Sequence, residues 1–426
     1  MSSTIEPASA EASVGATGDA PLRPLIVALG VVVIMVDGFD LQVIGFLAPE
    51  IARSWGLNVA AFGPVFSAGL FGSMIGAMAA GHFVRWTSLR AVMAGSLALF
   101  GACTLVTASA ESLGVLTVLR FIVGLGLGAA VPVVVSIVTR NSPARFRATL
   151  IVLTLCGQPV GAIIGAALCA RLIPIWGWPA GFYLAGLPPL LLIAPALALL
   201  RRNAQSMSVA EGSGDAEESG RWRQLFGGKL FATTLLLWAC CFLAAFVIYI
   251  IVNWLPASVR ADQRTLQQSL LAISMFNLGG IVGALSWAVL MDRYGPARVM
   301  VTAFAIAAIA LAALDPLQPW FTVFLAAVFV CGFAAYGGAM TIAPLAILLY
   351  PPFLRTMAVG WVLGMGRLGA TTGPLCASLA LTAGLAVARL FYMAALAAAL
   401  ATVSLCFLAR RHHRGEGMTW QSVSRP

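Results

Sequence analysis

Charged side chains are scarce in this chain of 426 residues, of which 9% are Asp, Glu, Lys or Arg and 61% are apolar. An ordinary soluble domain carries roughly a quarter of charged residues, so these few could not cover a water-soluble fold. Lysine is almost absent, because Lys229 is the only one among 25 basic residues. The charges stand singly or in small groups between long apolar runs, which argues against a nucleic-acid partner despite the net charge of +10. The composition therefore predicts a polytopic helical membrane protein.

Signals for other classes of protein are also missing. No apolar core precedes Arg23, which predicts a cytoplasmic N-terminal tail and no cleavable signal. The eight cysteines lie inside apolar runs without the spacing of metal ligands, and the three histidines fall in predicted loops or in the C-terminal tail. We therefore expect no metal site and no cofactor.

Twelve apolar segments are long enough to cross a bilayer, whose core of about 30 Å requires roughly 20 helical residues. The predicted spans are 25–48, 61–82, 91–109, 113–138, 148–171, 179–200, 230–255, 267–290, 299–314, 320–348, 356–382 and 390–409. The predicted organisation is an N-terminal tail (1–22), a six-helix bundle (23–200), a polar cytoplasmic linker (201–229), a second six-helix bundle (230–409) and a C-terminal tail (410–426).

The basic residues predict the orientation in the membrane, since cytoplasmic loops carry an excess of Arg and Lys. With both termini inside, 18 of the 25 basic residues lie on the cytoplasmic side and five lie outside. The remaining two, Arg120 and Arg367, lie within spans. We expect a multi-pass protein of the inner, cytoplasmic membrane with cytoplasmic termini.

The two bundles share residues at a constant offset of 208 positions. Arg85 corresponds to Arg293, and Gly161 to Gly369. The other matching pairs are Arg90 with Arg298, Pro143 with Pro351, Arg147 with Arg355, and Gly165 with Gly373. Such a duplication predicts a two-fold arrangement of the halves with a cavity between them, which is the architecture of a transporter.

Four motifs resemble those of the major facilitator superfamily and, within it, of the aromatic acid/proton symporter family that includes 4-hydroxybenzoate and protocatechuate transporters. The motifs are Asp37-Gly-Phe-Asp40 in the first span, Arg120-Phe-Ile-Val-Gly-Leu-Gly-Leu-Gly in the fourth, Met291-Asp-Arg-Tyr-Gly295, and Tyr350-Pro351 followed by Gly364-Met-Gly-Arg367. The resemblance covers nearly the whole chain. It implies an all-α fold and proton-coupled uptake of an aromatic carboxylate, such as a benzoate or hydroxybenzoate, by alternating access.

The chain departs from that family at the predicted cytoplasmic face. The loop after the second span contains no acid, Arg140 stands where the family has an acid near the end of the fourth span, and Phe353 replaces a Glu. We expect the gating residues to be Arg85, Arg90, Arg140, Arg147, Asp292, Arg293, Arg298 and Arg355, with Asp292 as the acidic anchor. The unbalanced arginines predict contact with anionic lipid on this side.

Two carboxylates, Asp37 and Asp40, lie deep within a span. An Asp at a helix centre costs about 2.5–3.5 kcal/mol to insert, which favours a functional role, although a structural pair remains the alternative. Arg120 and Arg367 are expected in the same layer, so the four formal charges sum to zero. A bound organic anion would add a charge unless a proton entered with it. We therefore expect Asp37 and Asp40 to carry the proton.

An arginine fork suits a substrate carboxylate, but the sequence does not choose between Arg120 and Arg367, because either could instead pair with Asp37 or Asp40. Gly124 and Gly128 after Arg120 favour close helix packing over nucleotide binding. An aromatic ring requires flat walls with a few polar groups. The candidates are Gln158 and Asn277, which we favour, and Phe39, Tyr249, Asn253, Trp254, Tyr336 and Trp361.

Three functions other than symport are compatible with parts of the sequence. Gly157-Gln-Pro-Val-Gly161 faintly resembles the motif of drug/proton antiporters. The Asp37–Asp40 spacing is similar to half of the magnesium site of intramembrane prenyltransferases, but no second acidic cluster follows in any span. A sensor that binds the acid without moving it is the third. For the preferred symporter we expect a monomer whose partners are a small aromatic acid and membrane lipid, with no nucleic acid.

Overall fold

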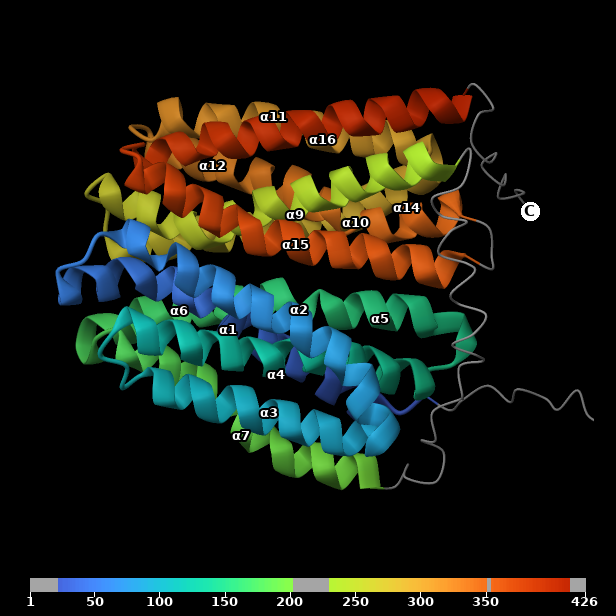
Figure 1. The fold of residues 1–426 in the computed structure, drawn as a ribbon, viewed down its shortest axis with the longest axis horizontal. Coiled ribbons are helices and arrows are strands. Elements are labelled where there is room, and N and C mark those ends of the chain that lie inside the picture. The colour runs from blue at the N-terminus through green and yellow to red at the C-terminus, as the bar shows by residue number, and fades with distance from the viewer. Residues whose placement is uncertain (1–21, 202–229, 351–353, 414–426) are drawn as a thin grey trace, which may run out of the picture.

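The computed structural model describes residues 22–201, 230–350 and 354–413, and this part of the chain is helical without strands (Figure 1). The N-half consists of α1 (Pro24–Trp55), η1 (Val59–Phe62), α2 (Gly63–Trp86), α3 (Leu89–Thr107), α4 (Leu113–Arg140), η2 (Ala144–Phe146), α5 (Arg147–Leu155), α6 (Gly157–Trp176) and α7 (Pro179–Arg201). The C-half consists of α9 (Leu230–Ala261), α10 (Leu266–Tyr294), α11 (Pro296–Leu317), α12 (Phe321–Cys331), η4 (Gly332–Tyr336), α13 (Gly337–Ala339), α14 (Ile342–Leu349), α15 (Arg355–Thr382), η5 (Val387–Arg389) and α16 (Leu390–His413). The predicted linker and tails lie almost wholly outside the described residues.

Eleven helical segments of the described chain have the length and hydropathy to cross a membrane. The twelfth, α15, is long enough at 28 residues, but Arg367 and its many glycines and threonines lower its hydropathy. The predicted all-α fold of twelve spans in two bundles is therefore confirmed. In Figure 1 the N-half forms the lower layer, from blue to green, and the C-half forms the upper layer, from yellow to red.

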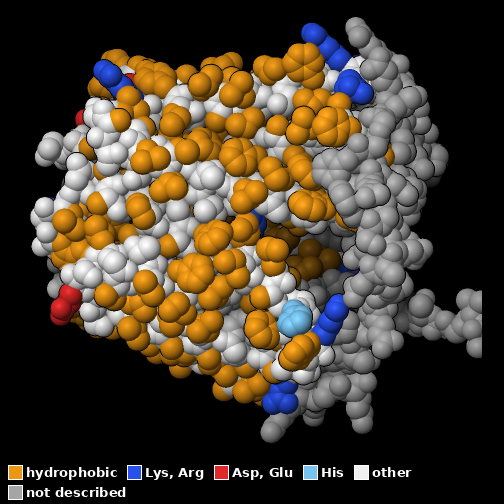
Figure 2. Space-filling model, viewed as in Figure 1, with side chains coloured by type: hydrophobic (Ala, Val, Ile, Leu, Met, Phe, Trp, Pro, Cys, Tyr) orange, Lys and Arg blue, Asp and Glu red, His pale blue; other side chains and the backbone are white. Residues whose placement is uncertain are grey.

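The two halves touch at one end of the molecule and separate at the other. We call the end where α1 begins and α16 ends the arginine-rich end. Away from it, the Ser67 hydroxyl donates to the Thr371 carbonyl at 2.8 Å, and the Ser378 hydroxyl donates to the Ala60 carbonyl at 2.7 Å. Towards the arginine-rich end the halves separate, and Figure 2 shows the surface hollowed between them. The protein is thus closed at the opposite end and open at the arginine-rich end.

Two spans are interrupted beside the interface between the halves. The fifth span breaks at Cys156 into α5 and α6, because Pro159 has no N–H for the carbonyl four residues earlier and its ring would clash there. The tenth span contains a π-helical turn from Gly332 to Tyr336. Turns of this kind are frequent at functional sites because they re-aim side chains. Here the two breaks place Gln158 and Tyr336 near the centre of the molecule.

Candidate functional site

Glycines bring the first carboxylate against α6. A Cβ on Gly38 would overlap the backbone of Gln158, and a Cβ on Gly161 would overlap the backbone of Met35, so α1 and α6 meet at a distance that only glycine permits. This approach lets Gln158 Nε2 donate to Asp37 Oδ2 at 3.1 Å. Asp37 is 2% exposed, and its neighbour on the other helix is neutral.

The second carboxylate is enclosed within the N-half. Thr104 Oγ1 donates to Asp40 Oδ1 at 2.8 Å, and Arg120 Nη1 lies 3.8 Å from Asp40 Oδ2. The Arg120 guanidinium also donates to Thr104 at 3.2 Å and lies over the ring of Phe182, 5.3 Å from its centroid. Asp40 and Arg120 are fully buried, so they form a pair that neutralises its own charge.

The glycines that follow Arg120 on α4 have the packing role expected from the sequence. A Cβ on Gly124 would overlap the backbone of Gly69, and a Cβ on Gly128 would overlap the backbone of Ser73, both on α2. The close approach of α2 and α4 fixes the height of Arg120 in the N-half.

Arg367 is the arginine that lies across from this enclosed pair, on α15 of the C-half. Its Nη1 donates to Ser73 Oγ of α2 at 2.5 Å, and its charge interacts electrostatically with Asp37 and with Tyr249. Arg367 is half-buried and forms no ion pair with another described residue. The four intramembrane charges therefore form one connected layer, with one arginine still available to an anion.

A cavity of about 190 Å³, here called the central cavity, lies between the halves. Gln42 and Gln158 line it from the N-half, and Tyr249 and Tyr336 line it from the C-half, among apolar side chains. Tyr336 stacks on Phe276 with an interplanar angle of 11°, which fixes the orientation of its ring. Flat walls and a few polar groups are the features of a site for a small aromatic molecule.

A smaller cavity of about 20 Å³ lies beside the buried pair. Asp40 and Arg120 line it from the N-half, and Tyr249 and Asn253 line it from the C-half. This volume corresponds to about one water molecule. Tyr249 lines both cavities, so it connects the enclosed carboxylate with the central cavity.

Gln42 is a polar residue of the site that the sequence analysis missed. Its amide exchanges two hydrogen bonds with the amide of Asn277, each of 3.0 Å, and Asn277 also donates to the Ile273 carbonyl. Both side chains are buried, and the pair joins α1 to α10 across the halves. Gln42 follows Asp37 by five residues and Asp40 by two, so it points to a different side of α1 from either acid, and helical spacing gave no signal for it.

Three predicted aromatic candidates lie away from the central cavity. Phe39 packs against Gly165 of α6, and Trp254 meets Phe66 edge to face at 5.3 Å between the halves. Trp361 is half-exposed and stacks on another tryptophan near the arginine-rich end. Their contacts explain these rings as packing groups in the structure described here.

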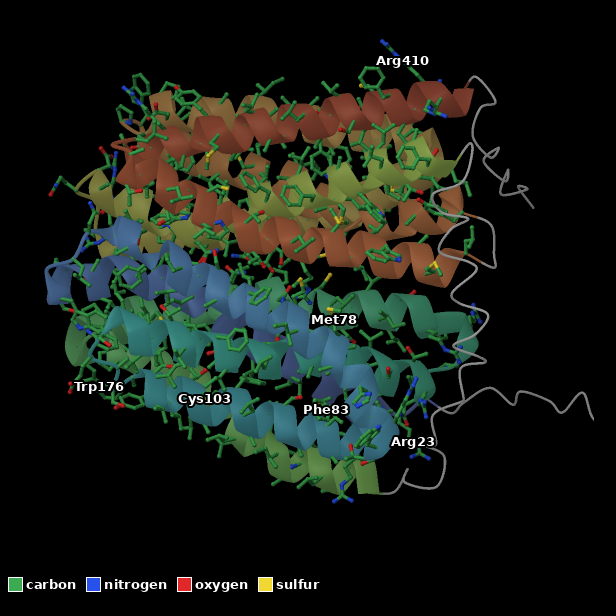
Figure 3. All side chains as sticks on the ribbon, viewed as in Figure 1. Arg23, Met78, Phe83, Cys103, Trp176 and Arg410 are labelled. Atoms are coloured by element: carbon green, nitrogen blue, oxygen red, sulfur yellow. The ribbon has the colours of Figure 1, made fainter. Side chains whose placement is uncertain are left out.

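The predicted gating residues gather at the arginine-rich end, the end at which Figure 3 places Arg23 and Arg410. Exposed side chains in this group are Arg85, Arg140, Asp292, Arg293 and Arg298, whereas Arg90 and Arg147 are half-buried. Asp292 forms no ion pair with any side chain that the structure describes, which fits the separation of the halves here. The side chain of Arg355 lies outside the described residues.

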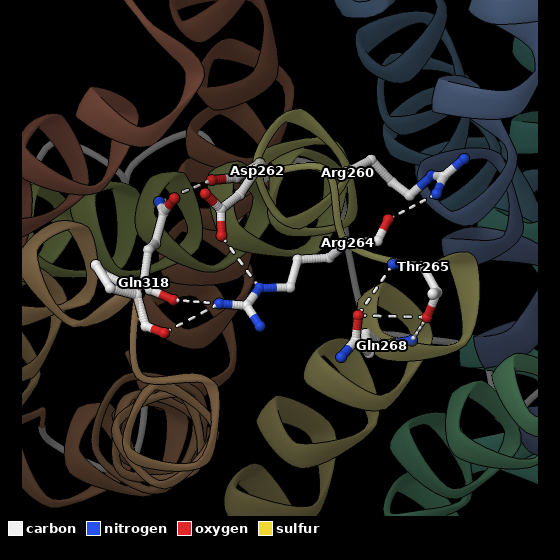
Figure 4. A network of polar contacts seen from close by, with 8 residues as sticks. Arg260, Asp262, Arg264, Thr265, Gln268 and Gln318 are labelled. Carbon is white, nitrogen blue, oxygen red and sulfur yellow. Dashed lines mark hydrogen bonds and ion pairs between the residues drawn. The ribbon is translucent and has the colours of Figure 1, made fainter.

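The opposite end contains an ion pair between the halves that the sequence analysis did not single out. Glu50 Oε1 of α1 lies 2.6 Å from Arg260 Nη2 of α9, and Glu50 Oε2 lies 2.9 Å from Arg53 on its own helix. Arg260 Nη1 donates to the Arg264 carbonyl at 2.6 Å, and Arg264 in turn bonds Asp262 and the Gln318 carbonyl (Figure 4). The loop after α9 thus holds Arg260 in place for Glu50.

The two related bundles are in contact at one end and open at the other, and a central cavity with buried charges lies between them. This arrangement defines a secondary transporter of the alternating-access type. The chain matches the model of the Major Facilitator Superfamily over residues 30–267 and 261–419. It is similar to the gallate transporter of Pseudomonas putida, with 32% identity and 92% of each chain covered. It is also similar to the 3-(3-hydroxy-phenyl)propionate transporter of Escherichia coli, with 34% identity over 84% of this chain and 87% of the relative, and to the 4-hydroxybenzoate transporter of Acinetobacter baylyi, with 31% identity over 83% and 85%.

Solved structures agree in fold. The D-xylose-proton symporter has a TM-score of 0.71 at 15% identity, covering 90% of this chain and 96% of the symporter. A bacterial homologue of the human lysosomal transporter Spinster, in an inward-facing and occupied conformation, has a TM-score of 0.70 at 15% identity, covering 94% and 100%. The chain belongs to the Major Facilitator Superfamily and, within it, to the aromatic acid transporters; it is a membrane transporter and not an enzyme.

Proposed function

We propose that this protein takes up a monocyclic aromatic carboxylate together with a proton, by alternating access across the inner membrane. The arginine-rich end would face the cytoplasm, in agreement with the excess of Arg on that side. The observation that carries the proposal is a central cavity beside four charges within the spans, three of them buried, whose formal sum is zero. Relatives named for gallate, 4-hydroxybenzoate and 3-(3-hydroxy-phenyl)propionate support the class of substrate.

The size and walls of the central cavity suit a single ring. An apolar cavity of about 150 Å³ is known to bind benzene, so about 190 Å³ accommodates a benzene ring with polar substituents. We assign the ring to the space between Tyr249 and Tyr336. Gln158 and Gln42 would bond polar groups on the ring, and Asn277 would act through Gln42.

Arg367 is the residue we assign to the substrate carboxylate. Arg120 is engaged by Asp40 inside the N-half, whereas Arg367 has a neutral hydroxyl as its described partner. A planar guanidinium can bond both oxygens of a carboxylate, which would replace the Ser73 contact. We therefore expect Arg367→Lys to raise the KM for uptake more than it lowers the maximal rate.

Asp37 is the residue we assign to the proton, with Asp40 in support. Its described partner is the neutral amide of Gln158, which can rotate to accept a hydrogen bond from the protonated acid. Because Gln158 lines the central cavity, the proton and the substrate would meet at one amide. Binding an anion and a proton together leaves the charge of the layer unchanged, which avoids an uncompensated charge in the membrane.

Uptake of labelled aromatic acids into proteoliposomes tests the proposal. We expect uptake to increase as the external pH is lowered and concentrative uptake to collapse with a protonophore. Accumulation that ignores the protonophore would exclude proton coupling, and proton movement opposite to the substrate would identify an antiporter. A screen with benzoate, hydroxybenzoates, protocatechuate and phenylpropanoid acids identifies the substrate.

A further inference from the structure

A second cavity of about 410 Å³ lies away from the transport path, between α2, α3 and α4. We call it the α2–α3 groove. Its lining is almost entirely apolar and includes Gly76, Phe83, Ala91, Gly95 and Leu125. Phe83, Thr87 and Ala91 lie where α2 ends and α3 begins, so the groove opens at the arginine-rich end. Figure 3 shows Phe83 at the same end of the N-half as Arg23.

The shape of the groove follows from the glycines of its walls. Gly76 of α2 and Gly126 of α4 allow close packing onto neighbouring backbone and side chains, so α2 and α3 both lie on α4. Gly95 of α3 has no atom within 4 Å of the position of a Cβ, so this side of the groove is open space. The lining runs from Ala91 to Leu99 along α3, about 12 Å, and Phe83 and Leu99 are partly exposed, so the groove fits a segment of a hydrocarbon chain that enters from outside.

The mouth of the groove is positively charged. Arg85 lies in the last turn of α2 and Arg90 lies in the first turn of α3, on either side of the lining residue Thr87. Neither arginine forms an ion pair with a described residue, and the Arg90 Nε atom is buried without a hydrogen-bond partner among them. The sequence contains no acid from Ala79 to Ala91 or from Arg140 to Ala148.

The mouth of the groove is expected to lie at the level of the lipid headgroups in the membrane. Trp86 at the end of α2 is 77% exposed, and tryptophan is enriched where a membrane helix meets the headgroups. The corresponding loop of the C-half differs in charge, because Asp292 directly precedes Arg293 there. An anion is therefore favoured at the N-half loop more than at its counterpart.

We propose that the α2–α3 groove binds one anionic phospholipid, with an acyl chain along the groove and the phosphate between Arg85 and Arg90. The lipid would neutralise these arginines when the arginine-rich end closes and brings them towards Arg293 and Arg298 of the C-half. Like charges repel as they approach, so a bound anion makes closure easier. Lipid binding in this groove is independent of which solute is transported.

Native mass spectrometry of the purified protein, titrated with dioleoylphosphatidylglycerol, tests the site. We expect Arg85→Gln with Arg90→Gln to weaken binding by about 25-fold, since each basic residue contributes roughly fivefold. The matched control is Arg293→Gln with Arg298→Gln, which removes the same charge from the other half and should change binding less than twofold. Equal losses in both double variants would overturn the proposal, because they indicate a general surface charge.

A groove-filling variant tests the acyl chain separately. Gly95→Phe places a ring in the groove without an internal clash, whereas Gly114→Phe adds the same ring at an equally open position near the start of α4, at the other end. We expect only Gly95→Phe to lower phosphatidylglycerol binding, by tenfold or more. Full binding in Gly95→Phe, equal binding of phosphatidylcholine, or equal competition by soluble glycerol phosphate would each contradict a lipid seated in this groove.

Discussion

The ion pair between Glu50 and Arg260 joins the halves at the end opposite the arginine-rich end. Removing it should shift the transporter towards the state that is open at the end where this ion pair lies. The two groups are 2.6 Å apart, and the side chains of Glu50 and Arg260 are 10% and 22% exposed. At an effective dielectric constant of about 20 the attraction is about 6 kcal/mol, but desolvation of both charges offsets most of it. Exposed ion pairs contribute about 0–1 kcal/mol and breaking a buried one costs about 3–5 kcal/mol, so this partly buried pair is worth about 1.5–3 kcal/mol. We therefore expect Glu50→Gln to raise the population open at this end by roughly 10- to 150-fold.

Spin-label distances measure this shift directly. Leu57 and Gln267 are exposed on either side of the interface, on the N-half and the C-half respectively, and can carry labels once the eight native cysteines are replaced. The expected result in Glu50→Gln and in Arg260→Gln is a longer distance in a larger fraction of molecules. Because both variants break one contact, the double variant should differ little from either single one.

The matched control is Arg53→Gln. Arg53 also bonds Glu50, at 2.9 Å, but it lies on the same helix and its side chain is 74% exposed. Such a pair contributes about 0–1 kcal/mol and cannot hold the halves together. If Arg53→Gln shifted the distances as much as Arg260→Gln, or if neither Glu50→Gln nor Arg260→Gln shifted them, the reasoning from the inter-half contact would be refuted.

Three further predictions concern the site and its packing. Asp37→Asn should abolish concentrative uptake while the protein remains folded and inserted, and Asp40→Asn should abolish it with a lowered Tm, because Arg120 loses its buried counter-ion; a double variant that still accumulates labelled substrate against a gradient would remove both from the mechanism. Gly161→Leu should destabilise the protein by about 1–3 kcal/mol because α1 and α6 cannot part without loss of packing, which a lowered Tm would show against Gly360→Leu at an open position. Gln42→Leu should remove both bonds between Gln42 and Asn277 and leave the buried Asn277 oxygen without its donor, costing about 1–3 kcal/mol, and a Tm and KM both equal to those of the wild type would contradict the assigned pair.

The helical spans could be predicted from the sequence because the bilayer sets both their length and their polarity. The charged layer could be predicted for the same reason, since a buried charge stands out in an apolar span, as Asp37 and Arg367 do. The partner of each charge could not, because it depends on helix rotation and on which helices touch. Arg120 of α4 pairs with Asp40 of α1, and this pair depends on how α4 packs against α1, which the order of residues in the sequence does not give.

Residues that act between the halves were the hardest to predict. Gln42 and Glu50 are ordinary polar residues on α1, and their roles appear only when α10 and α9 are placed beside them. Aromatic residues were predicted in the site too often, because a ring such as Trp254 packs between helices as readily as it lines a site. The duplication at offset 208 indicates which helices correspond, but not which of them meet across the interface.

The low hydropathy of α15 has a consequence for how the chain enters the membrane during synthesis. Arg367 costs about 2.5–3.5 kcal/mol at a helix centre, and few side chains of α15 offset it compared with the other spans. Its described hydrogen-bond partner, Ser73, belongs to α2, which is made much earlier. We therefore expect α15 to insert stably only when the N-half, with α2 available, is already in the bilayer. Synthesis from the N-terminus makes the acceptor helix before the charged one, and this order favours the insertion of α15.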